Sequence, residues 1–207
     1  MPVQKKRQIR KFYQNNVVIL LTTSDIFVWG SYFVLNILAG LYLEEALGQD
    51  AIRIVGTGTG IYFISRAIFQ LPLGIITDRL KSDKDEIFIL FLASFFIGIP
   101  YMLYPTIKTE SFYYLLQAVI GLGSSLNLNT WRKLFAKNID KNEEGREYGF
   151  YETLMSISSA ILVTVGGIVA NISKEWFDAV IFGVGIITIL GGLFGGCIIL
   201  VKDRKSK

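Results

Sequence analysis

Six long apolar segments, separated by short polar connections, make up most of this chain. They cover roughly residues 17–43, 54–77, 87–105, 111–130, 148–170 and 177–201. A bilayer core about 30 Å thick needs about 20 mostly apolar residues per helix, so each segment is long enough to cross it. No connection is long enough to hold a soluble domain. The pattern therefore predicts an all-α membrane protein, with residues 1–207 forming a single bundle of six transmembrane helices.

Polar side chains recur along one face of four of the six predicted helices. A polar stripe within a membrane helix must face protein or a watery cavity, whereas a uniformly apolar helix can face lipid. Segments 87–105 and 177–201 have few polar residues, so we expect them at the lipid. The stripes in the other four contain Thr22, Asp25, Trp29, Tyr32 and Asn36, then Tyr62, Arg66, Gln70, Gly74 and Asp78, then Ser124, Asn127 and Trp131, and finally Glu152, Ser156 and Ser159.

The composition agrees with lipid as the solvent. Of the 207 residues, 52% are hydrophobic and only 18% are charged, whereas about 25% are charged in a typical soluble domain. The chain has no histidine and one cysteine, Cys197. These counts exclude histidine-based zinc sites, Ser-His-Asp and Cys-His catalysis, and an intrachain disulfide. We therefore expect no enzymatic activity, no metal and no cofactor.

The distribution of basic residues predicts the orientation. Of the 21 lysines and arginines, 17 lie in the two termini and in the connections that would share their side of the membrane. The opposite side has only Arg53, Lys108 and Lys174. The positive-inside rule then predicts a multi-pass protein of the plasma membrane with both termini in the cytoplasm, in contact with the lipid bilayer and not with nucleic acid. The outer side would carry an aromatic belt of Tyr42, Tyr101, Tyr104, Tyr113, Tyr114 and Trp176.

A short motif ends the second predicted helix. The run Leu71–Arg79 contains Gly74, three residues and then Asp78-Arg79. This run resembles the signature of the major facilitator superfamily between its second and third helices, and Gln117–Gly123 and Gly145-Arg146 are similar to that family's fourth helix and its entry to the fifth. The resemblance covers the family's N-terminal six-helix half. It implies that Gly74, Asp78 and Arg79 form a conformational latch.

The charged residues within the predicted membrane spans are the main candidates for function. A charge at this depth costs about 2.5–3.5 kcal/mol on insertion scales, so Arg66 needs a reason to be there. Three interpretations remain open: an Arg66–Asp25 ion pair that joins two helices, an anion site at Arg66, and proton or cation coupling through Asp25. For Glu152 two interpretations remain open, an ion pair with Arg132 or Arg146, which we favour, and a place in the cavity. Further residues predicted to contact solute are Gln70, Asn36, Tyr62 and Asn127.

These features predict a secondary transporter of a small polar solute that works by alternating access. Such a transporter needs two six-helix bundles that move around a site at the membrane midplane. A chain with one bundle would work as a half-transporter, either as a parallel homodimer or with a second six-helix half. Two alternatives remain: a non-transporting membrane scaffold or regulator on the same bundle, and a fragment of a longer transporter.

Overall fold

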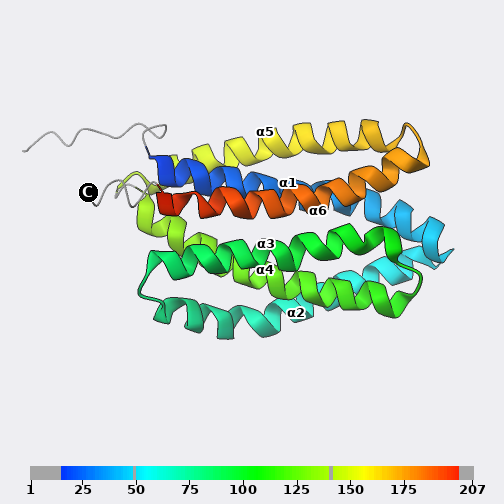
Figure 1. Cartoon of the computed structure of the whole chain (residues 1–207), viewed down its shortest axis with the longest axis horizontal. Coiled ribbons are helices and arrows are strands. Elements are labelled where there is room, and N and C mark those ends of the chain that lie inside the picture. The colour runs from blue at the N-terminus through cyan, green and yellow to red at the C-terminus, as the bar shows by residue number, and fades with distance from the viewer. Residues whose placement is uncertain (1–14, 49, 140–141, 201–207) are drawn as a thin grey trace, which may run out of the picture.

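The computed structural model describes residues 15–48, 50–139 and 142–200. Six long helices and one short 3₁₀ helix account for most of them, and the described residues contain no strand, so the predicted all-α six-helix bundle is confirmed (Figure 1). The elements are α1 (Asn16–Leu47), α2 (Ala51–Arg79), α3 (Asp83–Leu103), η2 (Tyr104–Thr106), α4 (Glu110–Asn138), α5 (Glu144–Ala170) and α6 (Lys174–Gly196).

Five of the described helices are long and apolar enough to cross a bilayer, and α4 falls short on hydropathy although it has 29 residues. The lower hydropathy of α4 has a structural cause. Its central part carries polar residues that face other helices, among them Ser124, Ser125, Asn127 and Asn129. Polar groups of this kind are tolerated at membrane depth because protein, and not lipid, surrounds them.

Local signals define where the helices begin. The residues preceding α1, α3, α4 and α6 each accept a hydrogen bond from a backbone N–H of the first turn, which satisfies a donor that has no partner within the helix. Acidic residues occupy the first turn of α3, where the positive end of the helix dipole favours them. The four capping residues are Asn15, Ser82, Thr109 and Ser173.

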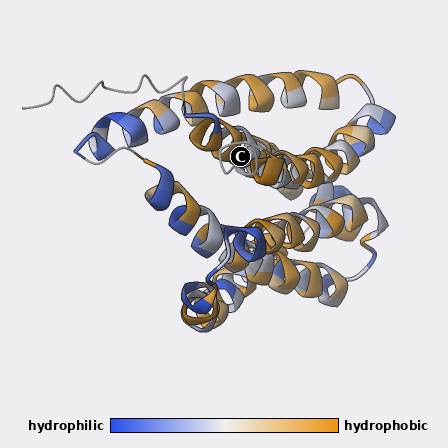
Figure 2. Ribbon diagram, turned by 60° about the vertical axis from the view of Figure 1, so that its left-hand side comes forward, coloured by the Kyte–Doolittle hydropathy of each residue, from blue (hydrophilic) through white to orange (hydrophobic). Residues whose placement is uncertain are grey.

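The bundle consists of two three-helix groups, α1 with α5 and α6, and α2 with α3 and α4 (Figure 1). The packing of α3 on α6 joins the two groups, and α1 adds smaller contacts with α2 and α4. Both described chain ends lie at the same end of the bundle, which we call the terminal end; the other is the opposite end. Apolar residues fill the middle of the helices, whereas hydrophilic residues gather near the helix ends and connections (Figure 2).

Glycines allow α3 and α6 to approach closely. A Cβ added to Gly98 would lie 2.7 Å from the carbonyl oxygen of Gly185, and one added to Gly185 would lie 2.5 Å from that of Gly98. Gly192 meets the side chain of Ser94 in the same seam, and Gly191 meets the backbone of Ser24 in α1. Small residues at helix interfaces replace the hydrophobic driving force that lipid cannot supply.

Hydrogen bonds join α2 and α4 along much of their length. The α4 residues involved are separated by seven and four positions, so a single face of α4 contacts α2. A Cβ on Gly121 would lie 2.6 Å from the carbonyl oxygen of Tyr62, which shows how closely the two backbones approach. The bonds are Ser65 Oγ to Ala118 O at 2.7 Å, Ser125 Oγ to Arg66 O at 2.9 Å, Gln70 Nε2 to Asn129 Oδ1 at 2.6 Å and Asn129 Nδ2 to Gln70 O at 2.8 Å.

A buried carboxylate continues this interface at the terminal end. The side chain of Glu86 is fully buried and accepts from Lys133 Nζ at 2.7 Å and from Lys137 Nζ at 2.5 Å. Lys133 also donates to the carbonyl oxygens of Thr77 at 2.5 Å and Leu80 at 3.4 Å, where α2 ends. One lysine of α4 therefore holds the end of α2 and the start of α3 together.

The structure corrects the predicted aromatic belt. Tyr42, Tyr101, Tyr104 and Tyr113 are each at most 8% exposed and pack inside the bundle, and only Trp176 of the predicted set is exposed. Position near a helix end did not reveal which way the rings point. Four of these tyrosines instead meet partners from other helices, such as the Phe177 ring that stacks on Tyr42.

The expectation that segments 87–105 and 177–201 face lipid describes only one face of each helix. The outer faces of α3 and α6 are apolar and exposed at Phe88, Leu92, Phe182 and Ile186, whereas their inner faces form the α3–α6 seam. The least covered helices of the described bundle are α2 and α5. A uniformly apolar sequence does not distinguish contact with lipid from contact with another helix, because both surroundings are equally apolar.

The α3–α6 seam predicts unequal effects of two neighbouring substitutions. Gly185→Ala should lower the free energy of unfolding by about 1–3 kcal/mol, because the new methyl group would overlap Gly98. Gly183→Ala is the matched control, since nothing lies within 4 Å of its added Cβ. Both changes alter helix propensity equally, so thermal unfolding of the purified variants isolates the overlap. Equal stability of the two variants would contradict this packing.

The Glu86 cluster gives a second stability prediction. Glu86→Gln should destabilise the protein by about 2 kcal/mol, less than the 3–5 kcal/mol typical when one partner of a fully buried pair is lost, because Lys133 and Lys137 are 19% and 39% exposed. Asp85→Asn changes the exposed neighbour and should stay within about 0.5 kcal/mol of the parent. Thermal unfolding in detergent measures both. If Glu86→Gln left the free energy of unfolding unchanged, the ion pairs of Glu86 with Lys133 and Lys137 would not stabilise the fold.

Candidate functional site

A cleft of about 1040 Å³ opens along the bundle between α1, α2, α4 and α5. No described residue of α3 or α6 lines it, so the four helices with predicted polar stripes are the four that border the cleft. Its lining combines two acidic, two basic and several aromatic side chains. They include Asp25, Trp29, Asn36, Arg66, Trp131, Arg132, Tyr148, Tyr151, Glu152, Ser156 and Ser159.

Asp25 is held in position on α1 by two other helices. The hydroxyl of Tyr151, on α5, donates to Oδ2 of Asp25. Its Oδ1 is buried and makes no hydrogen bond with a described residue. One turn nearer the terminal end, the Trp131 indole N–H donates to the carbonyl oxygen of Leu21 at 3.0 Å, which fixes α4 against α1. Asp25 is thus 2% exposed while still bordering the cleft.

Arg66 lies half-buried at the cleft and forms no ion pair with any described residue. The Arg66–Asp25 ion pair, one of the three interpretations of these charges, is therefore absent from this structure. The reason lies in helix packing. The backbone of α2 is bonded to α4, including Arg66 O to Ser125, and α2 makes much smaller contacts with α1, where Asp25 already has Tyr151 as its partner.

The expected ion pair of Glu152 is also absent among the described residues. Glu152 and Arg132 line the same cleft, but they form no salt bridge, and Arg146 pairs instead with Glu143 in the turn before α5. Glu152 and Arg132 are both exposed and border the same cleft as Asp25. The cleft therefore offers exposed charges of both signs.

Two predicted solute-contact residues lie away from the cleft. The side chain of Gln70 bonds to Asn129 across the α2–α4 interface. Asn127 is 1% exposed, and its Oδ1 is buried without a hydrogen-bond partner in the described residues. Helical periodicity placed both on polar stripes, but it could not show which stripe faces a neighbouring helix. Their contact with solute stays a prediction.

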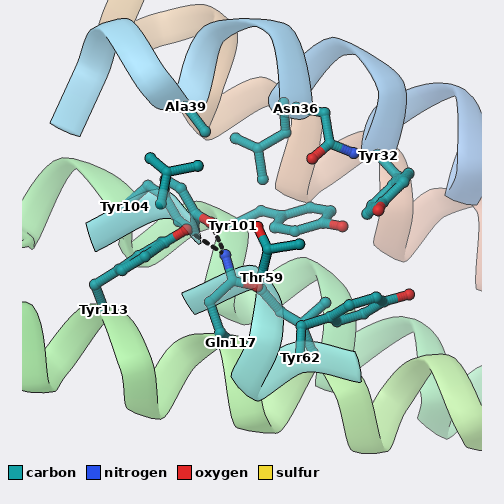
Figure 3. Close-up of a pocket in the computed structure, with 12 residues that line it drawn as sticks. Tyr32, Asn36, Ala39, Thr59, Tyr62, Tyr101, Tyr104, Tyr113 and Gln117 are labelled. Atoms are coloured by element: carbon teal, nitrogen blue, oxygen red, sulfur yellow. Dashed lines mark hydrogen bonds between the residues drawn. The ribbon is translucent and has the colours of Figure 1, made fainter. Parts of the chain in front are cut away.

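Tyr62 and Asn36 lead to a second, much smaller cavity of about 30 Å³ (Figure 3). This tyrosine chamber is lined by Tyr32, Leu35, Asn36, Ala39, Val55, Thr59, Tyr62, Tyr101, Tyr104, Tyr113, Gln117 and Ile120. Gln117 Nε2 donates to the hydroxyls of Tyr104 at 2.8 Å and Tyr113 at 3.0 Å. Asn36 lines both cavities, so it stands where the cleft and the chamber meet.

The three residues of the predicted latch lie at or near the end of α2. Gly74 faces Asn129 of α4, and its added Cβ would be 3.7 Å from Nδ2 of that residue, an ordinary contact. Asp78 and Arg79 are exposed and form no ion pair with any described residue. Their proposed role as a latch therefore stays a prediction, and any partner for them lies outside the described contacts of this chain.

Sequence reasoning missed three residues that shape the cleft. Tyr148, Tyr151 and Met155 of α5 line it at steps of three and four, so they share one helix face. The predicted stripe on that segment began instead at Glu152. The spacing of Tyr148 and Tyr151 could have placed both on the face of Glu152. Two tyrosines in an apolar segment are, however, equally compatible with packing against lipid. Among the described residues no group of three His, Cys, Asp or Glu side chains could hold a metal ion.

Comparisons with known proteins agree with this architecture. The family model of the Major Facilitator Superfamily matches residues 21–207. The uncharacterised MFS-type transporter YitZ of Bacillus subtilis (strain 168) is 24% identical over 138 residues, which are 67% of this chain and 80% of the relative. An uncharacterised transporter of Buchnera aphidicola subsp. Acyrthosiphon pisum (strain APS) is 47% identical over 45 residues, 22% of this chain and 11% of that relative.

No solved structure matches the chain significantly. The family match nevertheless covers nearly all the described residues, including every helix that lines the cleft. With the six-helix architecture, it shows that this multi-pass membrane protein belongs to the major facilitator superfamily, a family of transporters.

Proposed function

We propose that this chain is one six-helix half of a secondary transporter that moves a small polar solute, preferably an anion, by alternating access. The observation that carries the proposal is Arg66, a cation without an ionic partner among the described residues, at the wall of a cleft of about 1040 Å³. Charges within a membrane are expensive and mark solute or ion pathways by default. A scaffold or regulator would gain nothing from such a charge.

In this proposal Arg66 binds the anionic group of the solute. Its guanidinium offers several donors in a fixed plane that matches a carboxylate or phosphate. The bond from Ser125 to the backbone of Arg66 holds the base of the side chain, so its position is set before the solute arrives. Trp29 and Trp131 border the same cleft and supply apolar walls for the rest of the solute.

Asp25 is the proposed coupling residue. A carboxylate with one hydrogen-bonded and one unpartnered oxygen, reachable from the cleft, can exchange a proton or a cation with it. Tyr151 of α5 donates a hydrogen bond to this carboxylate. A change of charge at Asp25 would therefore change the strength of that bond and of the α1–α5 contact. This supports coupling between ion binding and the movement of α5.

Alternating access requires a second bundle, and the faces of α2 and α5 support one. These are the least covered helices, and each exposes a row of large apolar residues beside the cleft, such as Ile64, Ile68, Ile157 and Ile161. The relatives differ in length: YitZ is shorter than this chain, whereas the Buchnera relative is longer, since the same 45 residues make up a smaller share of it. We propose a parallel homodimer; a separate second half is the alternative.

Uptake by vesicles with the purified protein tests the solute site. Arg66→Ala should abolish uptake of a transported anion while membrane insertion and thermal stability remain near the parent values, because Arg66 has no ionic partner to lose among the described residues. Arg53→Ala removes an arginine of the same helix that pairs with Glu110 outside the cleft, and should leave uptake intact. Normal uptake by Arg66→Ala would refute the site.

The number of copies per particle in native membranes, counted by single-molecule photobleaching, tests the homodimer. Two copies per particle are expected, because each copy would cover the α2 and α5 faces of the other. Charged substitutions at both Ile64 and Ile157, which are 62% and 55% exposed, should give single copies. Exposed apolar residues of α3, such as Phe88, provide the control positions. Single copies of the parent protein would refute the homodimer and favour a separate six-helix half as the partner.

A further inference from the structure

The tyrosine chamber has features of a binding site that its size alone would not suggest. Its volume of about 30 Å³ has room for about two water-sized groups. Four long helices and η2 contribute to it, and no charged side chain is among the twelve that line it. The chamber lies on the side of Tyr62 away from the terminal end, where η2 and the start of α4 close it (Figure 3).

Two of the tyrosines that line the chamber have hydroxyls without a partner among the described residues, and both hydroxyls point away from Gln117, toward the Tyr32 side of the chamber (Figure 3). Those of Tyr62 and Tyr101 are buried, and neither forms a hydrogen bond with a described residue. A buried polar group without a partner is uncommon and calls for an explanation such as a bound molecule or water. Each phenol carries a donor hydrogen, so each can donate to an oxygen atom that accepts hydrogen bonds.

The remaining walls are held rigidly. Gln117 fixes the hydroxyls of Tyr104 and Tyr113, as the dashed lines of Figure 3 show. The ring of Tyr113 enters beside Gly58, where any side chain would overlap it. Tyr62 stacks on Tyr32 with ring centroids 6.1 Å apart. Both rings with unpartnered hydroxyls are thus packed against other rings, Tyr62 against Tyr32 and Tyr101 edge-on against Tyr104.

The chamber continues the cleft. Asn36 borders both cavities, and Tyr62 precedes Arg66 by one helical turn, a rise of about 6 Å along the same face of α2. A solute bound to Arg66 could therefore extend one uncharged end past Asn36.

We propose that the tyrosine chamber is a subsite for an uncharged hydroxyl or carbonyl oxygen at the far end of an anionic solute. This inference rests on the proposed function, since it assigns the anionic end to Arg66. A second charged group would not fit the chamber, because burying it there without an opposite charge is costly. The solute class is thus a small organic acid with a distal hydroxyl or oxo group.

Binding to the full chain in lipid nanodiscs tests the subsite, with the fluorescence of Trp29 and Trp131 as the signal. The probes are acetate, propionate and butyrate, each compared with its ω-hydroxy derivative: glycolate, 3-hydroxypropionate and 4-hydroxybutyrate. We expect the hydroxyl to tighten binding about three- to tenfold, the value of one ordinary hydrogen bond, and most strongly for the four-carbon acid, which best spans one helical turn.

Two variants attribute this gain to the chamber. Tyr62→Phe and Tyr101→Phe keep the rings and remove the unpartnered hydroxyls, so each should weaken the binding of 4-hydroxybutyrate more than that of butyrate and reduce the ratio of the two affinities. Tyr42→Phe is the matched control, because that tyrosine is also buried but stacks on Phe177 outside the chamber. Only the chamber variants should change the ratio of the two affinities.

The other outcomes overturn the inference in distinguishable ways. If the acids bind through Arg66 but hydroxyl groups bring no gain, or the three variants behave alike, the chamber holds only water and the proposed function stands. If none of the acids binds, or binding survives Arg66→Ala unchanged, the anionic solute class is wrong and both proposals fall.

Discussion

The hydrogen-bonded interface between α2 and α4 is the interaction on which the cleft depends. Serine and asparagine side chains of α4 bond to backbone or side-chain groups of α2 at successive turns, and Lys133 extends the interface to the end of α2. In lipid no water can replace these hydrogen bonds, so breaking them is costly. The interface therefore sets the rotation of α2 about its axis. That rotation places Arg66 at the cleft and Tyr62 in the chamber.

The same interface explains why an unpaired cation can persist beside a carboxylate on another helix. Asp25 belongs to the group of α1, α5 and α6, where Tyr151 satisfies one of its oxygens. Arg66 belongs to the group of α2, α3 and α4. The two groups meet mainly through the glycine seam of α3 and α6, on the side of the bundle away from the cleft. A movement of one group against the other would change the width of the cleft without breaking a bond between Arg66 and Asp25.

Close packing and polar function are thus divided between helices. Gly98, Gly185 and Gly192 give α3 and α6 a tight contact that needs no polar partner. The four charged side chains that line the cleft, Asp25, Arg66, Arg132 and Glu152, lie on α1, α2, α4 and α5. Exposed apolar faces on α2 and α5 remain beside this polar cleft. An apolar rim around a polar cavity suits a protein that meets a second bundle and encloses a solute between the two.

The sequence by itself determined the number of helices, the fold class and the four helices that border the cleft. Hydrophobic length and polar periodicity report directly on burial in a bilayer, and Arg66 and Asp25 stood out because charge at that depth is costly. Only the tertiary structure showed which partner each polar residue meets. Asp25 bonds to Tyr151 and Gln70 bonds to Asn129, and three tyrosines of the predicted belt line an interior chamber. The reason is that periodicity specifies a face of a helix, whereas the neighbour of that face depends on how all six helices pack together.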